Sequence, residues 1–283
     1  MSKELIGGQA VIEGVMMINQ QKIAIACRKP NQDIIVKNDK LKKLPKIFEL
    51  PFLRGIIKLF VMLYVGIKAL NWSTDVSLEE EEGDMSGWQL IFMIIFAVGL
   101  AIALFKFLPL FFAGLINDKI GNNYIVFNIL DGLIKIGLFI GYVSAISLMK
   151  DVKRLFMYHG AEHKAVHCRE SKKELTIENV QKFPTLHKRC GSAFIMVVLT
   201  LSIITYTFIP QTTTFFGKLG FRLLLLPIIA GISYEILRAS AKYNDNWFFD
   251  KITIPGIWLQ KLTTKEPDDK QVEVAIRALK EVT

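Results

Sequence analysis

The sequence predicts a mainly α-helical, polytopic membrane protein with four transmembrane helices, an interfacial helix, a small N-terminal antiparallel β meander and a C-terminal cytosolic helix. Apolar residues make up 52% of the 283 residues and the mean hydropathy is +0.36, above the usual balance of a soluble domain. Charged residues still make up 22%, which is too many for a chain built only of membrane spans. The basic residues flank the apolar stretches, as the signals that orient membrane helices do.

Residues 1–46 are predicted to form a cytosolic β meander and a basic linker. Three short β-prone runs, the first at residues 10–18, are separated by polar turn residues. Three glycines interrupt this region, where either turn geometry or the close approach of another group to the backbone requires them: Gly7, Gly8 and Gly14. The first residues lack the apolar core of a signal peptide, so we expect the amino terminus as written.

Residues 47–87 predict an interfacial amphipathic helix followed by an acidic loop. The helix, at 51–72, is apolar but contains three cations, a composition that allows it either to cross the membrane or to lie on it. Lysines precede it and glutamates 79–82 follow it. We therefore place it on the membrane surface, with its cations toward anionic head groups.

Residues 88–149 and 193–240 each predict a pair of transmembrane helices. The four apolar stretches of spanning length are 88–116, 124–149, 193–209 and 219–237. The loops at 117–123 and 210–218 contain few cations, whereas the segments 150–189 and 242 onward are rich in lysine and arginine. This pattern predicts a multi-pass protein of the cell membrane with both termini and residues 150–192 in the cytosol.

Charged residues inside the predicted spans require partners, because each costs about 2.5–3.5 kcal/mol at the centre of a membrane helix. Asp131 and Lys135 are four residues apart, which predicts an intrahelical ion pair, with a role in transport as the alternative. Glu235 lies near the cytosolic end of the fourth span, on the side where residues 150–192 emerge.

Residues 150–192 contain all four histidines of the chain and two of its three cysteines. Residues 159–163 read H-x-x-E-H, the inverted form of the zinc-protease helix signature. On a helix, His159 and His163 lie one turn apart on the same face, so both imidazoles can bind one ion. Glu162 then remains to act as the general base on a metal-bound water. The alternative interpretation is a helix with ordinary half-buried polar residues.

The third ligand of the divalent metal, which we predict to be Zn²⁺, has three candidates: His187, Cys190 and Glu235. His167 is excluded from the coordination sphere of His159, because eight helical residues separate the two by about 12 Å. Cys190 precedes the third span, where the helix N-terminus and nearby cations favour the thiolate. Cys190 is interpreted as a zinc ligand, a nucleophile or a small buried residue at a helix start.

Residues 241–283 predict a return to the membrane interface followed by a cytosolic helix. Pro267 and two aspartates begin this helix, and its apolar stripe consists of Val272, Ile276, Leu279 and Val282. The stripe needs a partner in the same compartment. We expect it to pack on the N-terminal meander and to form with it a cap over the histidine segment.

Long sequence strings connect this chain with a known family. They are residues 7–17 (GGQAVIEGVMM), 158–164 (YHGAEHK), 189–191 (RCG), 266–269 (EPDD) and 272–276 (VEVAI). Through them the chain resembles, over nearly its whole length, the YqhQ-like family of bacterial membrane proteins, described as uncharacterised or as metal-dependent enzymes. Ile18 and Lys188 depart from that pattern, in which an arginine and a proline are frequent at these positions.

The leading functional hypothesis is a membrane-bound, metal-dependent hydrolase with its site at the cytosolic membrane boundary, acting on a peptide or a lipid-linked substrate. One alternative is a non-catalytic assembly factor or scaffold with a structural zinc. Another is a small carrier that uses Asp131, Lys135 and Glu235 within the membrane. The net charge of +9 is accompanied by no nucleic-acid recognition motif, so nucleic acid is not an expected partner. Three widely spaced cysteines predict reduced thiols.

Overall fold

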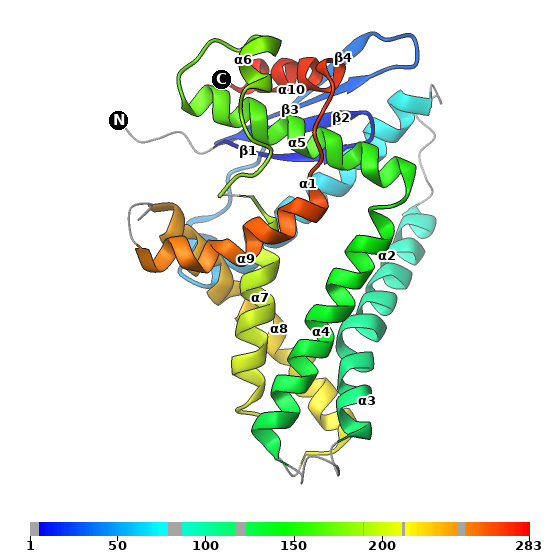
Figure 1. Cartoon of the computed structure of the whole chain (residues 1–283), viewed down its shortest axis with the longest axis vertical. Coiled ribbons are helices and arrows are strands. Elements are labelled where there is room, and N and C mark those ends of the chain that lie inside the picture. The colour runs from blue at the N-terminus through cyan, green and yellow to red at the C-terminus, as the bar shows by residue number, and fades with distance from the viewer. Residues whose placement is uncertain (1–5, 79–86, 117–122, 189, 211–212, 243–246) are drawn as a thin grey trace.

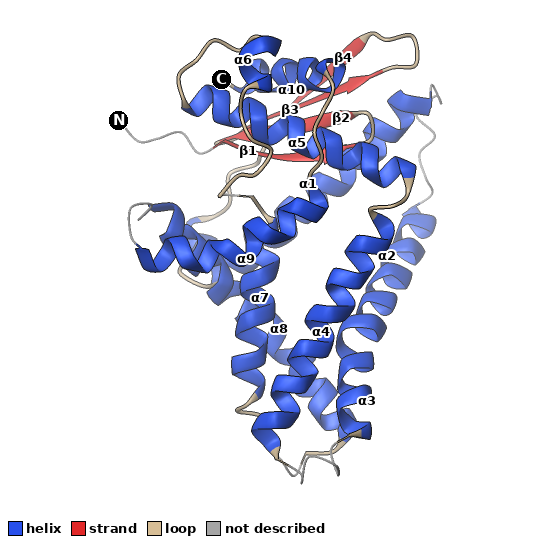
Figure 2. Ribbon diagram, viewed as in Figure 1, coloured by secondary structure: helices blue, strands red, loops and turns tan. Residues whose placement is uncertain are grey.

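The computed structural model describes residues 6–78, 87–116, 123–188, 190–210, 213–242 and 247–283. A cap that contains a four-stranded sheet lies at one end of the long axis, and a group of long helices extends away from it (Figure 1). Helices dominate, and the strands of the described residues lie in the cap (Figure 2). The predicted mainly α class with an N-terminal meander is therefore confirmed. The predicted features at 79–82, at 117–122 and at Arg189 lie outside the described residues.

The cap sheet consists of antiparallel strands in sequence order: β1 Ile6–Val11, β2 Gly14–Asn19, β3 Lys22–Arg28 and β4 Ile34–Lys40. Residues 10–18, predicted as one run, belong to two strands, because Val11 pairs with Gly14 across a two-residue turn. Glu13 in this turn has a φ of 50°, the left-handed conformation that a tight hairpin needs. Because the strand order is β1-β2-β3-β4, β1 lies at one edge of the sheet.

Two helices cover one face of the sheet, α5 Lys150–Glu170 and α10 Asp269–Val282, and the short α6 Ile177–Gln181 packs against both of them. The predicted packing of α10 on the meander is confirmed, because its whole apolar stripe is buried against β2, β3 and α5. Asp268 and Gln271 form a capping box at the start of α10. Thr176 caps α6, since its side chain accepts a hydrogen bond from the Asn179 N–H.

The other face of the sheet packs against α1 Leu53–Leu78, through buried side chains that include Met16 and Ile25. A short 3-10 helix, Lys46–Glu49, precedes α1. The outer side of α1 exposes large apolar residues, among them Phe60 and Tyr64, as expected of a helix at a membrane interface. It ends later than the predicted residue 72.

The long apolar helices extend from the cap. They are α2 Gly87–Ile102, continued by a π-helical turn at Ala103–Phe107 and by α3 Leu108–Leu115, then α4 Tyr124–Ile146, α7 Ser192–Tyr206, α8 Phe215–Lys242 and α9 Trp247–Thr263. Among the described residues, three helices are long and apolar enough to cross a membrane: Gly87–Leu115, Tyr124–Ile146 and Phe215–Ser240. The apolar α7 has 15 residues and is shorter than those three. This is the composition of a membrane protein.

Buried charges connect the long helices. The predicted pair is confirmed, with Lys135 Nζ 3.3 Å from Asp131 Oδ2. Asp131 also receives Arg222 of α8, whose Nη1 lies 2.6 Å from Oδ1. Lys106 donates to the Tyr206 hydroxyl at 2.8 Å. Because these side chains are almost fully buried, they are held away from lipid by one another.

The helix that contains the histidines is separate from the second apolar helix. α4 ends at Ile146, and Met149 is extended with a ψ of 135° before α5 begins. This break changes the direction of the chain, so α5 crosses the cap instead of rising from the membrane helices (Figure 1). The change places α5 against the sheet, where its polar residues become buried.

Leu279 provides a test of the cap core, because its side chain is fully buried between α10 and the sheet. Leu279→Ala should lower the free energy of unfolding by about 2–5 kcal/mol through lost burial and the remaining cavity. Lys280→Ala, at the adjacent exposed position, should change it by less than about 0.5 kcal/mol. Denaturant unfolding of the purified protein in detergent measures both. Equal effects of the two substitutions would contradict this packing.

Candidate metal centre

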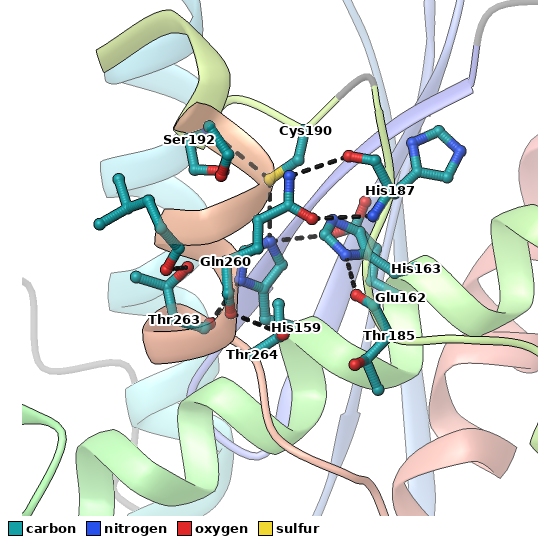
Figure 3. Close-up of polar contacts among 12 residues, drawn as sticks. His159, Glu162, His163, Thr185, His187, Cys190, Ser192, Gln260, Thr263 and Thr264 are labelled. Carbon is teal, nitrogen blue, oxygen red and sulfur yellow. Dashed lines mark hydrogen bonds and ion pairs between the residues drawn. The ribbon is translucent and has the colours of Figure 1, made fainter. Parts of the chain in front are cut away.

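The candidate site lies where α5, the loop before α7 and the end of α9 meet (Figure 3). His159 and His163 project from one face of α5, and their ring centroids are 4.5 Å apart. Cys190 comes from the loop, with Sγ 3.3 Å from His159 Nε2. One ligand atom from each of these three residues lies within 4.8 Å of the others. The spacing predicted from the helix therefore brings both imidazoles together, and Cys190 joins them.

Backbone carbonyls orient both histidine rings. His159 Nδ1 lies 2.8 Å from the Thr263 carbonyl oxygen, and His163 Nδ1 lies 2.5 Å from the Thr185 carbonyl oxygen. A carbonyl only accepts, so in each ring Nδ1 is assigned the proton and Nε2 keeps the lone pair. Histidines that bind metals in proteins are held in this way. Burial also lowers the pKa of His163 well below its usual value, which keeps this ring neutral at physiological pH.

Gly160 allows the Thr263 segment to reach α5. A Cβ at this position would lie 2.1 Å from the Lys265 carbonyl oxygen, so a larger residue would separate the two backbones. The Lys265 N–H in turn donates to the Phe156 carbonyl at 2.9 Å. The glycine inside the H-x-x-E-H pattern is therefore required for the contact that orients His159.

Glu162 lies beside the three ligand atoms but is not one of the group. Its Oε2 is 4.0 Å from His159 Nε2, and the residue is 6% exposed. Burial raises the pKa of Glu162 to about 7, an effect that His159 partly opposes. The carboxyl group borders a cavity of about 180 Å³ that is also lined by His163, His187 and Cys190. This position suits a general base that faces a bound substrate.

Gly8 of the edge strand closes the site over Glu162. A Cβ at Gly8 would lie 2.8 Å from the Glu162 carboxyl group, whereas a Cβ at Gly7 would meet no atom within 4 Å. Gly8 therefore fits the second of the two alternatives stated for these glycines, the close approach of another group to the backbone. In the sequence, this contact was indicated only by the two adjacent glycines, Gly7 and Gly8.

Cys190 differs from expectation in its ionisation. Burial raises the pKa of this thiol, although the Ser192 N–H, 3.5 Å from Sγ, acts in the opposite direction. The helix start at Ser192 does not offset the loss of solvent around the sulfur. Without a metal, Cys190 is therefore expected as a neutral thiol, whereas a coordinated ion would remove its proton.

Two of the predicted third ligands, Glu235 and His187, do not belong to the group formed by His159, His163 and Cys190. The carboxylate of Glu235 pairs with Arg54 of α1, whose Nε is 2.6 Å from Oε1, so it does not complete the histidine group. His187 borders the cavity, but its ligand atoms group with those of His167 and Glu170. Gln260 of α9 holds the His187 backbone through two hydrogen bonds of 2.8 Å. Neither this glutamine nor the orienting carbonyls could be identified from the sequence.

A larger groove of about 900 Å³ adjoins the cavity and shares Gly7, Gly8 and Gly191 with it. Its walls come from β1, β2, the basic linker and α1. Both cations and apolar side chains line it, including Lys42, Lys43, Lys58, Met16, Val61 and Met62. The groove therefore has α1 in its wall and adjoins the cavity that Glu162 lines.

Comparison with known proteins gives one family and one curated relative. The chain matches the family described as "Protein of unknown function (DUF1385)" over residues 50–283. It is 36% identical over 293 residues to a protein of Bacillus subtilis (strain 168) described as "Uncharacterized protein YqhQ", a match that covers 98% of this chain and 91% of that protein. No solved structure matches.

The contact between Gly8 and Glu162 can be tested by a matched pair of substitutions. Gly8→Ala should displace the buried carboxyl group and cost about 1–3 kcal/mol of unfolding free energy, the usual cost of overpacking. Gly7→Ala should have little effect, because its methyl group would meet open space. Thermal unfolding of the two purified variants provides the measurement. A Gly7→Ala variant as unstable as Gly8→Ala would show that strand geometry, and not the glutamate, requires these glycines.

Proposed function

The chain belongs to the family of proteins of unknown function DUF1385, and from its candidate site we propose that it is a membrane-bound, metal-dependent hydrolase. The observation that carries the proposal is the convergence of His159, His163 and Cys190, with both rings held at Nδ1 by carbonyls, next to a carboxyl group that borders a cavity. Two imidazoles and a thiol are a donor set that Zn²⁺ prefers.

The residues divide into binding and chemical roles. His159, His163 and Cys190 hold the metal, and a zinc ion with three protein ligands supplies a Lewis acid and an acidic water. Glu162 accepts the proton of the attacking water and returns it to the leaving group. Its burial favours proton exchange near neutral pH. Gly8 and the rest of the cavity wall limit access of bulk water to this carboxyl group.

The number of protein ligands separates the hydrolase from a scaffold with a structural zinc. Structural zinc sites have four protein ligands, whereas catalytic sites have three and an open position. Glu162 lies outside the group of three donors, and the cavity beside them supports an open position. The carrier alternative has less support, because Glu235 is paired with Arg54 and not with Asp131 or Lys135.

Of the two substrate classes, the groove favours a lipid-linked substrate over a peptide. An apolar chain can lie against Val61 and Met62, while Lys42 and Lys43 can pair with an anionic head group. Because α1 also forms a wall, a lipid could enter from the membrane surface without leaving the interface.

The proposed arrangement in the membrane has four spans, with both termini and the site in the cytosol. α7 is short, but its far end reaches the start of α4, where the Tyr124 hydroxyl donates to the Tyr206 carbonyl at 2.9 Å. Because α4 has spanning length, α7 extends to the same depth. The lysine-rich segments on either side of the two helix pairs favour the cytosolic orientation of the cap.

The ligands and the base respond differently to substitution. His163→Ala should lose the bound metal, whereas Glu162→Gln should retain it and lower hydrolysis by about 10²–10⁴-fold, because an amide cannot accept the proton. Metal analysis of the purified protein measures the first effect. Hydrolysis of fluorescent phospholipids and of a peptide library measures the second.

Acetohydroxamate provides the control for an open metal position. It should change the visible spectrum of the cobalt-loaded wild type, because it can replace a bound water. The scaffold would be favoured if acetohydroxamate leaves the spectrum unchanged and the Glu162→Gln variant functions as well as the wild type. Folded wild-type protein that binds no zinc would contradict both hypotheses.

The four-span topology predicts opposite labelling of two exposed positions. Lys173→Cys should react with a membrane-impermeant maleimide only after permeabilisation, whereas Pro210→Cys should react in intact cells. If α7 does not cross the membrane, positions 173 and 210 lie on the same side, and the two cysteine variants should be labelled alike. Reversed labelling would place the site outside the cytosol.

A further inference from the structure

A second cluster of ligand side chains lies next to the proposed site. His167, Glu170 and His187 each offer one ligand atom, and these atoms lie within 4.8 Å of one another. His167 and Glu170 come from the last turn of α5, and His187 comes from the loop before α7. The Nε2 atom of His187 is 3.5 Å from Glu170 Oε2, and the two histidine rings are 4.4 Å apart.

The surrounding backbone orients these residues as it does in the first site. His167 Nε2 lies 2.9 Å from the Leu186 carbonyl oxygen, so this nitrogen carries the proton and Nδ1 keeps the lone pair. Gln260 is fully buried, and its side-chain amide both accepts from the His187 N–H and donates to the His187 carbonyl. A buried amide whose two polar ends hold one residue's backbone fixes where that imidazole lies.

We propose that His167, Glu170 and His187 form a second metal site, separate from the site of His159, His163 and Cys190. Two imidazoles and one carboxylate, without a thiol, are a donor set for a divalent transition ion such as Zn²⁺, Mn²⁺ or Fe²⁺. Because His167 is too far along α5 to bind the first ion, its ring serves a different ion.

The two sites are neighbours. The four rings form a continuous row, in which His163 and His187 are 5.6 Å apart between centroids. Both of these rings line the cavity that Glu162 borders. With an ion bound, the second group would therefore place a positive charge beside the cavity, where it would suit an anionic group of the substrate. This consequence rests on the proposed hydrolase, whereas the second site itself does not.

Metal stoichiometry tests the second site. The full-length protein in detergent, stripped by a chelator and reloaded with Co²⁺, should bind one ion for each of the two ligand groups. His167→Ala and Glu170→Gln should each lose one of the two ions. Glu174→Gln removes an exposed carboxylate just beyond α5 and should lose none. Circular dichroism verifies that each variant is folded.

The thiolate distinguishes the two ions. Only the ion bound by Cys190 should give the near-ultraviolet band of sulfur-to-cobalt charge transfer, so His167→Ala should keep this band and Cys190→Ser should lose it. Wild type that binds a single ion with the thiolate band, unchanged in His167→Ala, would overturn the second site and leave the proposed hydrolase intact. A single ion without the band that His167→Ala removes would support the second site and contradict the first.

Discussion

The cap is organised by the burial of a polar helix. α5 lies between the sheet and two connecting segments, yet its buried part contains His163 and Lys164 as well as Glu162. A buried polar group without a partner costs about 1–3 kcal/mol, so each needs a partner from another part of the chain. Lys164 donates to the Gln181 carbonyl at 3.0 Å and pairs with Glu266 at 2.8 Å. The segments before α7 and after α9 are therefore held on α5 by Lys164 and by the two site histidines, whose rings contact the Thr263 and Thr185 carbonyls.

Buried charged groups among the apolar helices also need partners, but there they pair with one another. Asp131 pairs with both Lys135 and Arg222, and the three side chains connect α4 with α8 at almost complete burial. These charges face one another, so their geometry is that of a structural contact. At the cap, by contrast, one ligand atom from each of His159, His163 and Cys190 lies within 4.8 Å of the others, beside a cavity. The cavity beside these atoms is what distinguishes the candidate site from the buried ion pairs of the apolar helices.

Local patterns in the sequence were sufficient where partners belong to one element. The i, i+4 spacing predicted the pairing of His159 with His163, and the stripe of α10 predicted its buried face. Glu235 shows the limit of this reasoning. Topology predicted it near the histidines, but Arg54, distant in sequence and adjacent in the fold, pairs with its carboxylate. The grouping of His187 was equally beyond prediction, because Gln260, which is distant in sequence, holds the His187 backbone only through tertiary packing.

The candidate site is built from two of the connections between the cap and the apolar helices, the segment before α7 and the segment after α9. Thr263, the last residue of α9, orients His159, and Cys190 lies two residues before α7. α7 and α9 in turn touch where a Cβ at Gly256 would lie 2.4 Å from the Ala193 Cα, so their separation is fixed by the smallest residue. Any shift of these two helices changes the position of one ligand and the orientation of another. The geometry of the candidate site therefore depends on how α7 packs against α9, so it is coupled to the arrangement of the apolar helices outside the cap.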